Sequence, residues 1–346
     1  MITARADVGF SVDASVDHCA AISPETAPLA LVLRSVAASG YRFTTTTPLT
    51  QQRFLDRCGH QPGTTLRDIF GWNLPFAASA VAPALLASMD RAGILLSCGA
   101  VLRSAVRIAT IDDDLFLHSP YPTTEATAVF FGPDTYRFVR FIRHALQGGR
   151  GAKTRSAAGR SGGSLRILDV GCGSGAGGII AARQLADAGT PLAVTMNDIN
   201  PLALHYTAIN AEVANIPIAI APGDALSAVV GEFDLIVSNP PYLDDDLKRA
   251  YRHGGDRLGR ALSVRIAAEA LARLAPGGRL LLYTGVAIVN GIDPFRAELR
   301  PLLAAAGCDW TYAEIDPDVF GDELERPVYA HADRIAAVGL IATRNG

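Results

Sequence analysis

The chain has 346 residues, of which 49% are hydrophobic and 19% are charged. This length suffices for two domains, and the composition is typical of a folded globular protein rather than a disordered one. The formal net charge of -3 excludes a general electrostatic attraction to nucleic acids, although it leaves room for a local basic patch.

Neither a membrane nor a metal is expected as a partner. The first residues lack the basic-then-apolar pattern of a signal peptide, and the most apolar region, 76–102, is interrupted by Pro83 and Gly93. The five cysteines are scattered, with no CxxC pair and no zinc-ligand spacing. These features predict free thiols in a reducing, cytoplasmic setting.

The first 122 residues are predicted to form a smaller N-terminal α+β domain for substrate recognition. Residues 1–25 carry little pattern and are expected to be a loose tail. A β-hairpin is expected over 105–119, because two apolar runs flank three consecutive aspartates. Helices followed by a hairpin indicate a winged-helix-like module. The helices are expected at 28–40, at 48–58 with Thr47 as its cap, from 64 to 69, and at 77–92.

A second domain is predicted for residues 123–346. Its first helix should begin near Pro133, with Asp134 in the first turn. The stretch 148–164 is rich in Gly, Ser and Arg, and two interpretations stay open: a flexible loop, or a basic finger that touches an acidic partner.

From residue 165 onward, strands and helices alternate. This rhythm predicts an α/β fold with a doubly wound sheet and helices on both faces. Strands are expected at 165–170, 192–198, 216–224, 233–239, 279–285, 310–316 and 334–344, and helices at 175–189, 200–215 (capped by Asn200), 261–278 and 294–307.

A glycine-rich turn, DVGCGSGAGG, follows the first of these strands. Gly171, Gly173 and Gly175 allow a tight turn and let a ligand approach the backbone at a helix N-terminus. Asp198 ends the second strand 20 residues after Gly178, where a carboxylate can accept hydrogen bonds from a ribose diol. By itself this pattern fits both a phosphate-bearing and a nucleoside ligand.

Two further acids have two interpretations each. Asp224, just after the third strand, can bind an adenine amino group or cap a helix. Asp169, at the end of the first strand, can hold a cationic ligand or satisfy the N–H groups of the loop itself.

The fourth strand ends in Asn239-Pro240-Pro241-Tyr242. Two prolines cannot continue a central strand, so they stiffen the segment that carries the asparagine. The Asn239 side-chain oxygen and the Pro240 carbonyl can together accept both hydrogens of an NH2 group, and Tyr242 can stack on a planar amide or base. The pattern predicts a rigid site for an acceptor nitrogen.

The motifs DVGCGSG, NDINPLAL, GDAL and DLIVSNPPY, in this order, resemble those of class I S-adenosylmethionine-dependent methyltransferases. The NPPY form is similar to the amino-methylating branch, which includes the glutamine-N5 methyltransferases of release factors and ribosomal protein L3, and N-methylases of nucleic-acid bases. The resemblance implies a seven-stranded sheet whose last strand is antiparallel. It also implies S-adenosylmethionine as cofactor, bound by Asp169, Gly171, Gly173, Gly175, Asp198, Asp224 and Asn239, and an acceptor site at Asn239, Pro240 and Tyr242.

The acceptor itself is left open by the motifs. The segment 130–138 lies where the glutamine methyltransferases carry a loop over cofactor and acceptor, but it keeps only part of their pattern. Protein glutamine is the first choice of acceptor, with bases of RNA or DNA, or a small-molecule amine, as alternatives. A non-catalytic cofactor-binding module is disfavoured by the intact NPPY. The residues expected to shape the acceptor pocket are Phe131, Tyr136, Pro241 and His253.

Overall fold

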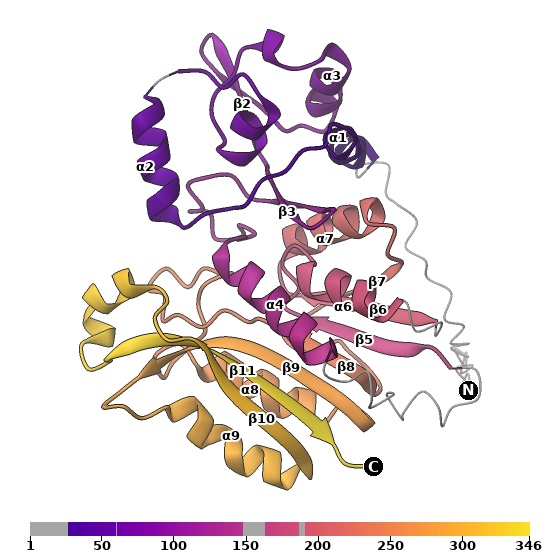
Figure 1. Ribbon diagram of the computed structural model, residues 1–346, viewed down its shortest axis with the longest axis vertical. Helices are drawn as coiled ribbons and strands as arrows, with labels where there is room; N and C mark the ends of the chain where they lie inside the picture. Colours follow the sequence, from indigo (N-terminus) through magenta and orange to yellow (C-terminus); the bar gives the residue numbers. More distant parts are fainter. Residues whose placement is uncertain (1–26, 60, 148–162, 187–190) are drawn as a thin grey trace, which may run out of the picture.

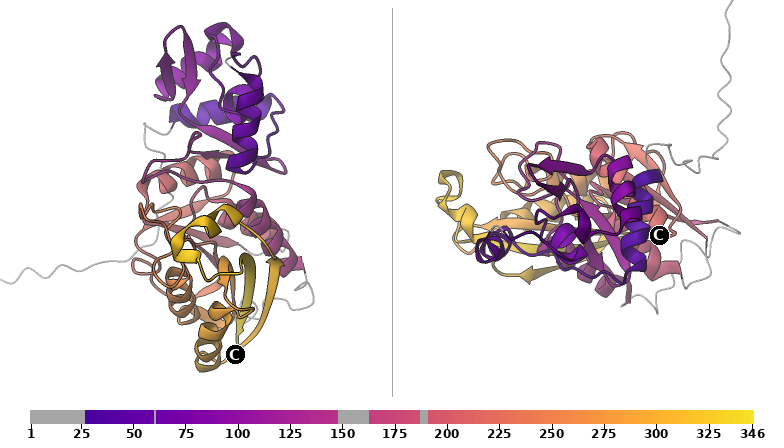
Figure 2. Two further views of the ribbon diagram at one scale, coloured as in Figure 1. Left: turned by 90° about the vertical axis from the view of Figure 1, so that its left-hand side faces the viewer. Right: turned by 90° about the horizontal axis from the view of Figure 1, so that it is seen from above.

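The computed structural model describes residues 27–59, 61–147, 163–186 and 191–346 (Figure 1). The predicted N-terminal tail and nearly all of the 148–164 loop lie outside the described residues. A twisted sheet with helices on both faces forms the larger part, and the N-terminal module stacks on one end of it (Figures 1 and 2). No helix within the described ranges has the length and apolar character needed to cross a bilayer.

The N-terminal module combines short helices with two β-hairpins. Its elements are α1 (Ala27–Ala38), α2 (Pro48–Cys58), the π-helical turn η1 (Arg67–Gly71), the 3-10 turn η2 (Ala78–Ala80), α3 (Pro83–Arg91), β1 (Leu95–Cys98), β2 (Val101–Ser104), β3 (Arg107–Ile111) and β4 (Asp114–His118).

The remaining elements build the sheet and its covering helices. They are α4 (Pro133–Gln147), β5 (Leu165–Val170), α6 (Ala176–Ala186), β6 (Leu192–Asp198), α7 (Pro201–Val213), β7 (Ile218–Pro222), β8 (Phe233–Ser238), α8 (Ala261–Leu271), β9 (Leu274–Ile288), α9 (Pro294–Ala305), β10 (Cys308–Asp316), the 3-10 turns η3 (Gly321–Glu325) and η4 (Pro327–Tyr329), and β11 (Arg334–Arg344).

The seven strands of the sheet lie in the order β10-β11-β9-β8-β5-β6-β7. The pairs from β7 to β9 are parallel, whereas β11 pairs antiparallel with both of its neighbours. This confirms the predicted doubly wound sheet with an antiparallel last strand. Because β5, β6 and β8 are parallel, their carboxyl ends meet at one edge, where open α/β sheets bind ligands.

The apolar strands are explained by burial on both faces of the sheet. Every residue of β8 is buried, as expected for a central parallel strand covered by helices on each side. One core lies between the sheet and α4 and α6, and a second lies between the sheet and α8 and α9. The four cysteines in the described part of the chain carry free thiols.

Most predicted elements begin and end close to the expected residues. Strands β5, β6 and β11 have the predicted bounds, and α2 begins after Thr47, whose hydroxyl accepts the Thr50 amide. Asn200 caps α7 through the Leu202 amide, as predicted. Capping side chains act within a few residues of their position, so they can be recognised in the sequence alone.

Two predicted helices are shorter than expected. The helix expected to run to residue 278 ends at Leu271, and β9 begins at Leu274, with a register shift against β8 that accommodates Pro276. A bulge is a place where a strand tolerates proline, because no ladder N–H is needed there. The helix expected over 77–92 begins only at Pro83, because a residue before proline avoids the helical region.

The predicted hairpin is present as β3 and β4, joined by a turn at Asp112 and Asp113. It is fixed to the sheet domain by α7, whose buried Asn210 accepts a hydrogen bond from the Leu117 amide and donates one to the Ser174 carbonyl. Residues of α7 also belong to the hydrophobic core of the N-terminal module. The module therefore packs on the same helix that supports the glycine loop, while the division at residue 122 remains a prediction.

Candidate active site

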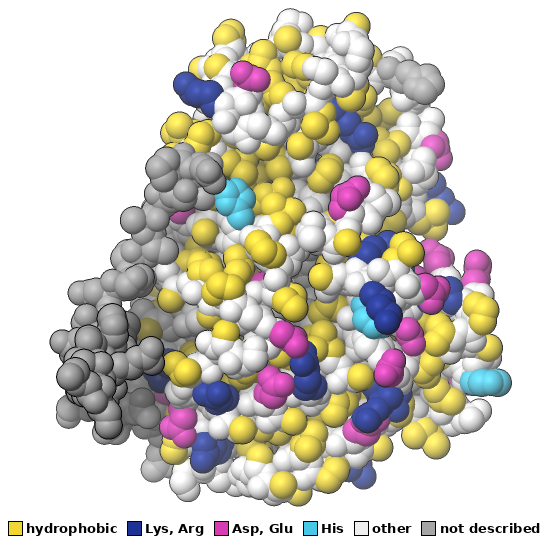
Figure 3. All heavy atoms as spheres, turned by 180° about the vertical axis from the view of Figure 1, so that it is seen from behind, with side chains coloured by type: hydrophobic (Ala, Val, Ile, Leu, Met, Phe, Trp, Pro, Cys, Tyr) yellow, Lys and Arg dark blue, Asp and Glu magenta, His cyan; other side chains and the backbone are white. Residues whose placement is uncertain are grey.

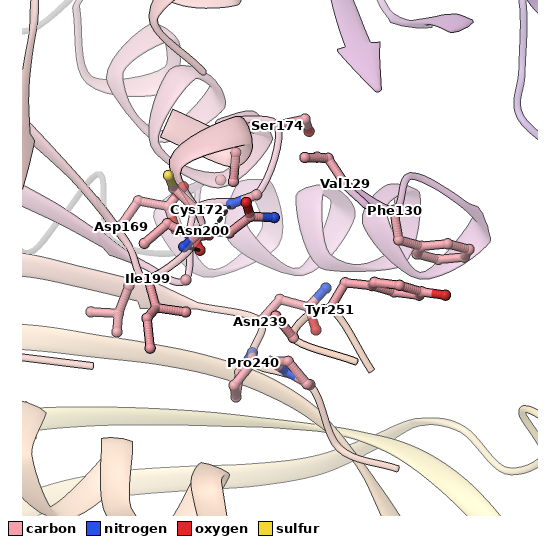
Figure 4. A pocket seen from close by; sticks show the side chains of 18 of the residues that line it. Val129, Phe130, Asp169, Cys172, Ser174, Ile199, Asn200, Asn239, Pro240 and Tyr251 are labelled. Carbon is pink, nitrogen blue, oxygen red and sulfur yellow. Dashed lines mark hydrogen bonds between the residues drawn. The ribbon is translucent and has the colours of Figure 1, made fainter. Parts of the chain in front are cut away.

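A pocket lies at the carboxyl ends of β5, β6 and β8 (Figure 4). Separate stretches of the chain converge there, among them the glycine turn, the ends of β6 and β7, the segment after β8 and the start of α4. The lining contains these predicted site residues: Asp169, Gly171, Gly173, Asp198, Asp224, Asn239, Pro240, Pro241 and Tyr242. Gly175 is not in the lining and lies at the start of α6, against Thr207.

The glycine turn presents bare backbone to the pocket. Gly171 and Gly173 have φ of 67° and 56°, in the left-handed region, and a Cβ added to either would meet nothing within 4 Å. The Thr207 hydroxyl of α7 donates to the Gly173 carbonyl at 2.9 Å and holds the turn in place. A ligand can therefore approach this backbone more closely than side chains would permit.

Asp198 is positioned by two backbone amides. One carboxylate oxygen accepts the Gly173 N–H at 2.9 Å and the other accepts the Asn200 N–H at 2.8 Å. Burial raises the pKa of this carboxyl. Each oxygen keeps acceptor capacity, so the carboxylate can still bind the two hydroxyls of a ribose.

Asp169 is buried beneath the glycine turn. Its Oδ2 accepts the Gly178 N–H at 2.7 Å, which is the structural alternative considered for this residue. Burial raises its pKa to about 7, and the charge of Asp198 acts in the same direction. Asp169 thus caps the first turn of α6 and also lines the pocket.

Asp224 lies at the exposed rim of the pocket. Arg265 binds its carboxylate with both terminal nitrogens, at 2.8 and 2.5 Å, and this pairing lowers the pKa of Asp224. Its side chain caps no helix amide among the hydrogen bonds of the described residues. The predicted contact with an adenine amino group therefore competes with a surface ion pair.

Asn239 carries the most informative atom of the site. Its Oδ1 is buried and accepts no hydrogen bond from any described residue. In Figure 4 its amide lies between the glycine turn and the stacked rings of Phe130 and Tyr251, with Pro240 beside it. A buried acceptor without a donor is costly, so this position favours a ligand that supplies an N–H.

Tyr242 is an anchor of the NPPY segment. Its hydroxyl donates to Asp134, which also accepts the Tyr283 hydroxyl at 3.0 Å and pairs with Arg137 at 3.0 Å. The Tyr242 ring packs so tightly on Gly285 that a Cβ there would lie 2.1 Å from it. One buried carboxylate thereby ties the first turn of α4 and strand β9 to the NPPY segment.

Burial of Asp134 raises its pKa to about 6, and the charge of Arg137 opposes this rise. The sequence placed Asp134 only in the first turn of a helix, so its role was missed. The signal was weak: an acidic residue at that position is ordinarily explained by the helix dipole.

Three residues predicted for the acceptor pocket lie outside its lining. Phe131 is buried in the core against Phe116, and the Tyr136 hydroxyl accepts the Thr45 amide on another face of α4. His253 accepts the Asp245 amide within its loop. In an extended segment, neighbouring side chains point to opposite sides, so Phe130 lines the pocket while Phe131 packs into the core.

Aromatic residues that line the pocket include Phe130, Tyr251 and Phe320, none of which was predicted. Phe130 and Tyr251 stack with ring centroids 6.1 Å apart and planes 13° apart. The Tyr251 hydroxyl donates to the Thr123 carbonyl at 2.7 Å. Nothing in the local sequence around Tyr251 indicated this position, because its partners are more than a hundred residues away.

Ion pairs fix the loop after NPPY. Arg249 and Arg252 both pair with Asp245, and Arg252 also reaches Glu323 in the segment between β10 and β11. Arg326 donates to the Asp244 carbonyl from the same segment. The acceptor side of the pocket is therefore assembled from distant parts of the chain.

Comparison with known proteins supports this description. Residues 160–287 match the protein family described as methyltransferase small domain. The chain is 36% identical over 173 residues to the release factor glutamine methyltransferase of Deinococcus radiodurans, covering 46% of this chain and 55% of that protein. It is 34% identical over 130 residues to the ribosomal RNA small subunit methyltransferase C of Pasteurella multocida, covering 38% and 34%.

Among solved structures, M. jannaschii TYW2 in complex with AdoMet superposes with a TM-score of 0.43 at 13% identity, covering 69% of this chain and 85% of that one. The chain spans about half the length of the release factor glutamine methyltransferase from D. radiodurans. The sheet order, the family match and the two sequence relatives confirm the predicted class of domain. The matched region is a class I S-adenosylmethionine-dependent methyltransferase domain. It resembles the branch that includes the release factor enzymes.

The residues present fit S-adenosylmethionine. The open backbone of Gly171 and Gly173 forms a cradle, and Asp198 keeps lone pairs for a ribose. The Asn239 oxygen without a donor lies in the same pocket. This donor and acceptor set matches a nucleoside beside an acceptor nitrogen.

Proposed function

We propose that this protein transfers a methyl group from S-adenosylmethionine to an amide or amino nitrogen. The observation that carries the proposal is the buried, unsatisfied Oδ1 of Asn239 in a pocket shared with the glycine turn. The Asn239 oxygen and the Pro240 carbonyl accept the two hydrogens of the acceptor NH2. This orients the nitrogen lone pair away from the NPPY segment and toward the pocket.

When bound, S-adenosylmethionine supplies an electrophilic methyl group. The chain contributes position, exclusion of water and hydrogen-bond acceptors for the positive charge that develops on the acceptor nitrogen. Gly171 and Gly173 would hold the methionine part and Asp198 the ribose. Asp134, through Tyr242, keeps the Asn239-Pro240 acceptors in place.

Protein glutamine is the acceptor that we favour, because the D. radiodurans relative, which covers 46% of the chain, is named for glutamine methylation. A base amino group of RNA is the second candidate. It is favoured by the relatives named as ribosomal RNA methyltransferases and by the stacked aromatic pair on the acceptor side. The face in Figure 3 bears interspersed acidic and basic side chains, so it offers no broad basic surface.

The proposal is tested with tritiated S-adenosylmethionine. The purified protein is incubated with separated protein, RNA and small-molecule fractions of a bacterial lysate. Label in one fraction that disappears with Asn239→Ala supports the proposal and identifies the acceptor class. Arg300→Gln, on the exposed face of α9, serves as the control for an unrelated substitution. Label that persists with Asn239→Ala would contradict the assigned role.

A further inference from the structure

A second cleft lies between the N-terminal module and α4, with a volume of about 430 Å³. Its lining includes three arginines and one carboxylate: Arg42, Arg67, Arg143 and Asp112. None of these residues belongs to the methyl-transfer pocket. The two cavities use different faces of α4, because Asp134 and Phe138 line the first while Tyr136, Val139 and Arg143 line the second.

A fourth arginine adds positive charge from within the protein. Arg107 is 4% exposed and donates only to neutral acceptors, the Gly71 carbonyl at 2.8 Å and the Gln51 side chain at 3.1 Å. No carboxylate pairs with it among the described residues. Burial lowers its pKa to about 10, so it stays charged at neutral pH. A buried charge without a counter-ion is expensive, and its field extends into adjacent space.

Arg107 lies close to the cleft, because it contacts the ring of Phe43, a residue of the cleft lining. The Arg107 guanidinium lies 5.8 Å from the centre of the Phe43 ring, and the Arg67 guanidinium lies 5.5 Å from it. Phe43 itself lines the cleft. Two guanidinium groups thus share one ring at the cleft wall.

The ion pairs that the arginines of this cleft form within the protein leave some of their N–H donors free for a ligand. Arg42 pairs with Asp113, and Arg143 pairs with Asp112, both in the hairpin turn. The buried Nε of Arg143 has no hydrogen-bond acceptor in the described part of the chain, and Arg67 forms no ion pair there. The lining therefore offers more donors and more positive charge than its own carboxylates satisfy.

We propose that this cleft binds a phosphate group, and that its ligand is the phosphodiester backbone of RNA. Guanidinium groups match the oxygens of phosphate with paired hydrogen bonds, and an open cleft lets a strand run past. A local excess of positive charge is compatible with a chain whose net charge is -3. The site is independent of methyl transfer, so its test reads binding rather than activity.

The test measures anisotropy of a short fluorescein-labelled single-stranded RNA with the full chain and its variants. Arg67→Gln should weaken RNA binding about tenfold. The slope of log K against log salt should fall by about the amount expected for one lost phosphate contact. Arg67 is exposed, so this variant should keep its fold, which circular dichroism checks. Arg300→Gln removes the same charge from α9 and should change affinity less than about twofold.

A variant of opposite sign sharpens the test. Asp112→Asn removes the carboxylate that competes for Arg143 and should tighten RNA binding several-fold. Asparagine tolerates the left-handed backbone at this position, where φ is 51°. Equal affinities for Arg67→Gln and Arg300→Gln, or weaker binding by Asp112→Asn, would overturn the proposal.

Competitors distinguish the source of the phosphate. Displacement of RNA by pyrophosphate but not by polyglutamate supports a phosphate site, whereas equal displacement by polyglutamate overturns it in favour of an acidic peptide. Binding of adenosine monophosphate without binding of RNA would overturn the proposal, because it would assign the cleft to a free nucleotide. Calorimetry with S-adenosylmethionine should give the same affinity for all three variants, which separates this result from the methyl-transfer proposal.

Discussion

The two sides of the methyl-transfer pocket are built in different ways. The cofactor side is mostly local: Asp169 and Asp198 accept backbone N–H groups of the glycine turn and of the adjacent helix starts, and the Thr207 hydroxyl holds the turn. The acceptor side is held by side chains from distant elements, with Asp134 of α4 and Tyr283 of β9 converging on Tyr242. Hydrogen bonds to the backbone hold most of the cofactor side in place, whereas the buried side chains of Asp134, Tyr242 and Tyr283 hold the acceptor side.

This difference suggests how the fold accommodates several acceptors. A cofactor side fixed by its own turn can stay the same while the acceptor side changes through substitutions in α4, in the loop after NPPY, or between β10 and β11. The unsatisfied Asn239 oxygen lies where the two sides meet. The following substitutions separate the two sides experimentally.

The largest effect is expected for Asn239→Ala. Loss of its oxygen removes half of the acceptor-NH2 contact, so the rate of methyl transfer should fall at least about a hundredfold. The affinity for S-adenosylmethionine, measured by calorimetry, should change only about twofold to threefold. A comparable loss in affinity and rate would show that the two sides are not separable at this residue.

Asp198→Ala should act on the cofactor side alone. Losing the ribose acceptor and the contact to the Gly173 amide should weaken S-adenosylmethionine binding by about tenfold or more. Calorimetry measures this change, with Asp309→Ala on exposed β10 as the matched control. Unchanged affinity in Asp198→Ala would refute the ribose assignment.

The Asp134–Tyr242 contact should act on the acceptor side alone. Asp134→Asn and Tyr242→Phe are each expected to lower kcat about fivefold to tenfold, because NPPY loses its anchor. The double variant should be little worse than Asp134→Asn alone, because the Tyr242–Asp134 hydrogen bond that Tyr242→Phe removes is already weakened in that variant. Steady-state rates of the wild type, the two single variants and the double variant, measured with the labelled acceptor fraction, form a double-mutant cycle. Additive losses in kcat would show that Asp134 and Tyr242 do not act through one contact.

The smallest effect on methyl transfer is expected from Asp169→Asn, which should act on folding stability and depend on pH. The folded pKa of about 7 lies above the ordinary 3.8, so the stability that the bound proton provides is full below about pH 4 and is lost as pH rises through 7. Relative to wild type, the variant should gain on the order of 2–3 kcal/mol in unfolding free energy at about pH 8 compared with about pH 5.

Chemical denaturation without cofactor at both pH values measures this difference. Asp90→Asn on exposed α3 should show no such dependence. A gain that is equal at both pH values would mean that Asp169 does not titrate in this range. Its hydrogen bond to Gly178 would then be the whole of its contribution.

The sequence by itself determined the sheet, the cofactor turn and the position of Asn239. Each depends on short-range rules: alternating apolar runs, glycines at positive φ, a capping asparagine, and prolines that end a strand. Such features act within a few residues and leave a readable pattern. The order of the motifs then sufficed to predict the class of the domain.

Only the tertiary structure decided which residues complete the site. In the sequence, Asp134 is an ordinary acidic residue in the first turn of a helix, and only the fold places Tyr242 and Tyr283 beside it. The fold also decides that Phe130, and not Phe131, lines the pocket. The arginine cleft likewise unites Arg42, Arg67 and Arg143, which have no common motif. Burial and long-range pairing decide these arrangements. The pKa and the contacts of a side chain depend on neighbours that only the folded chain brings to it.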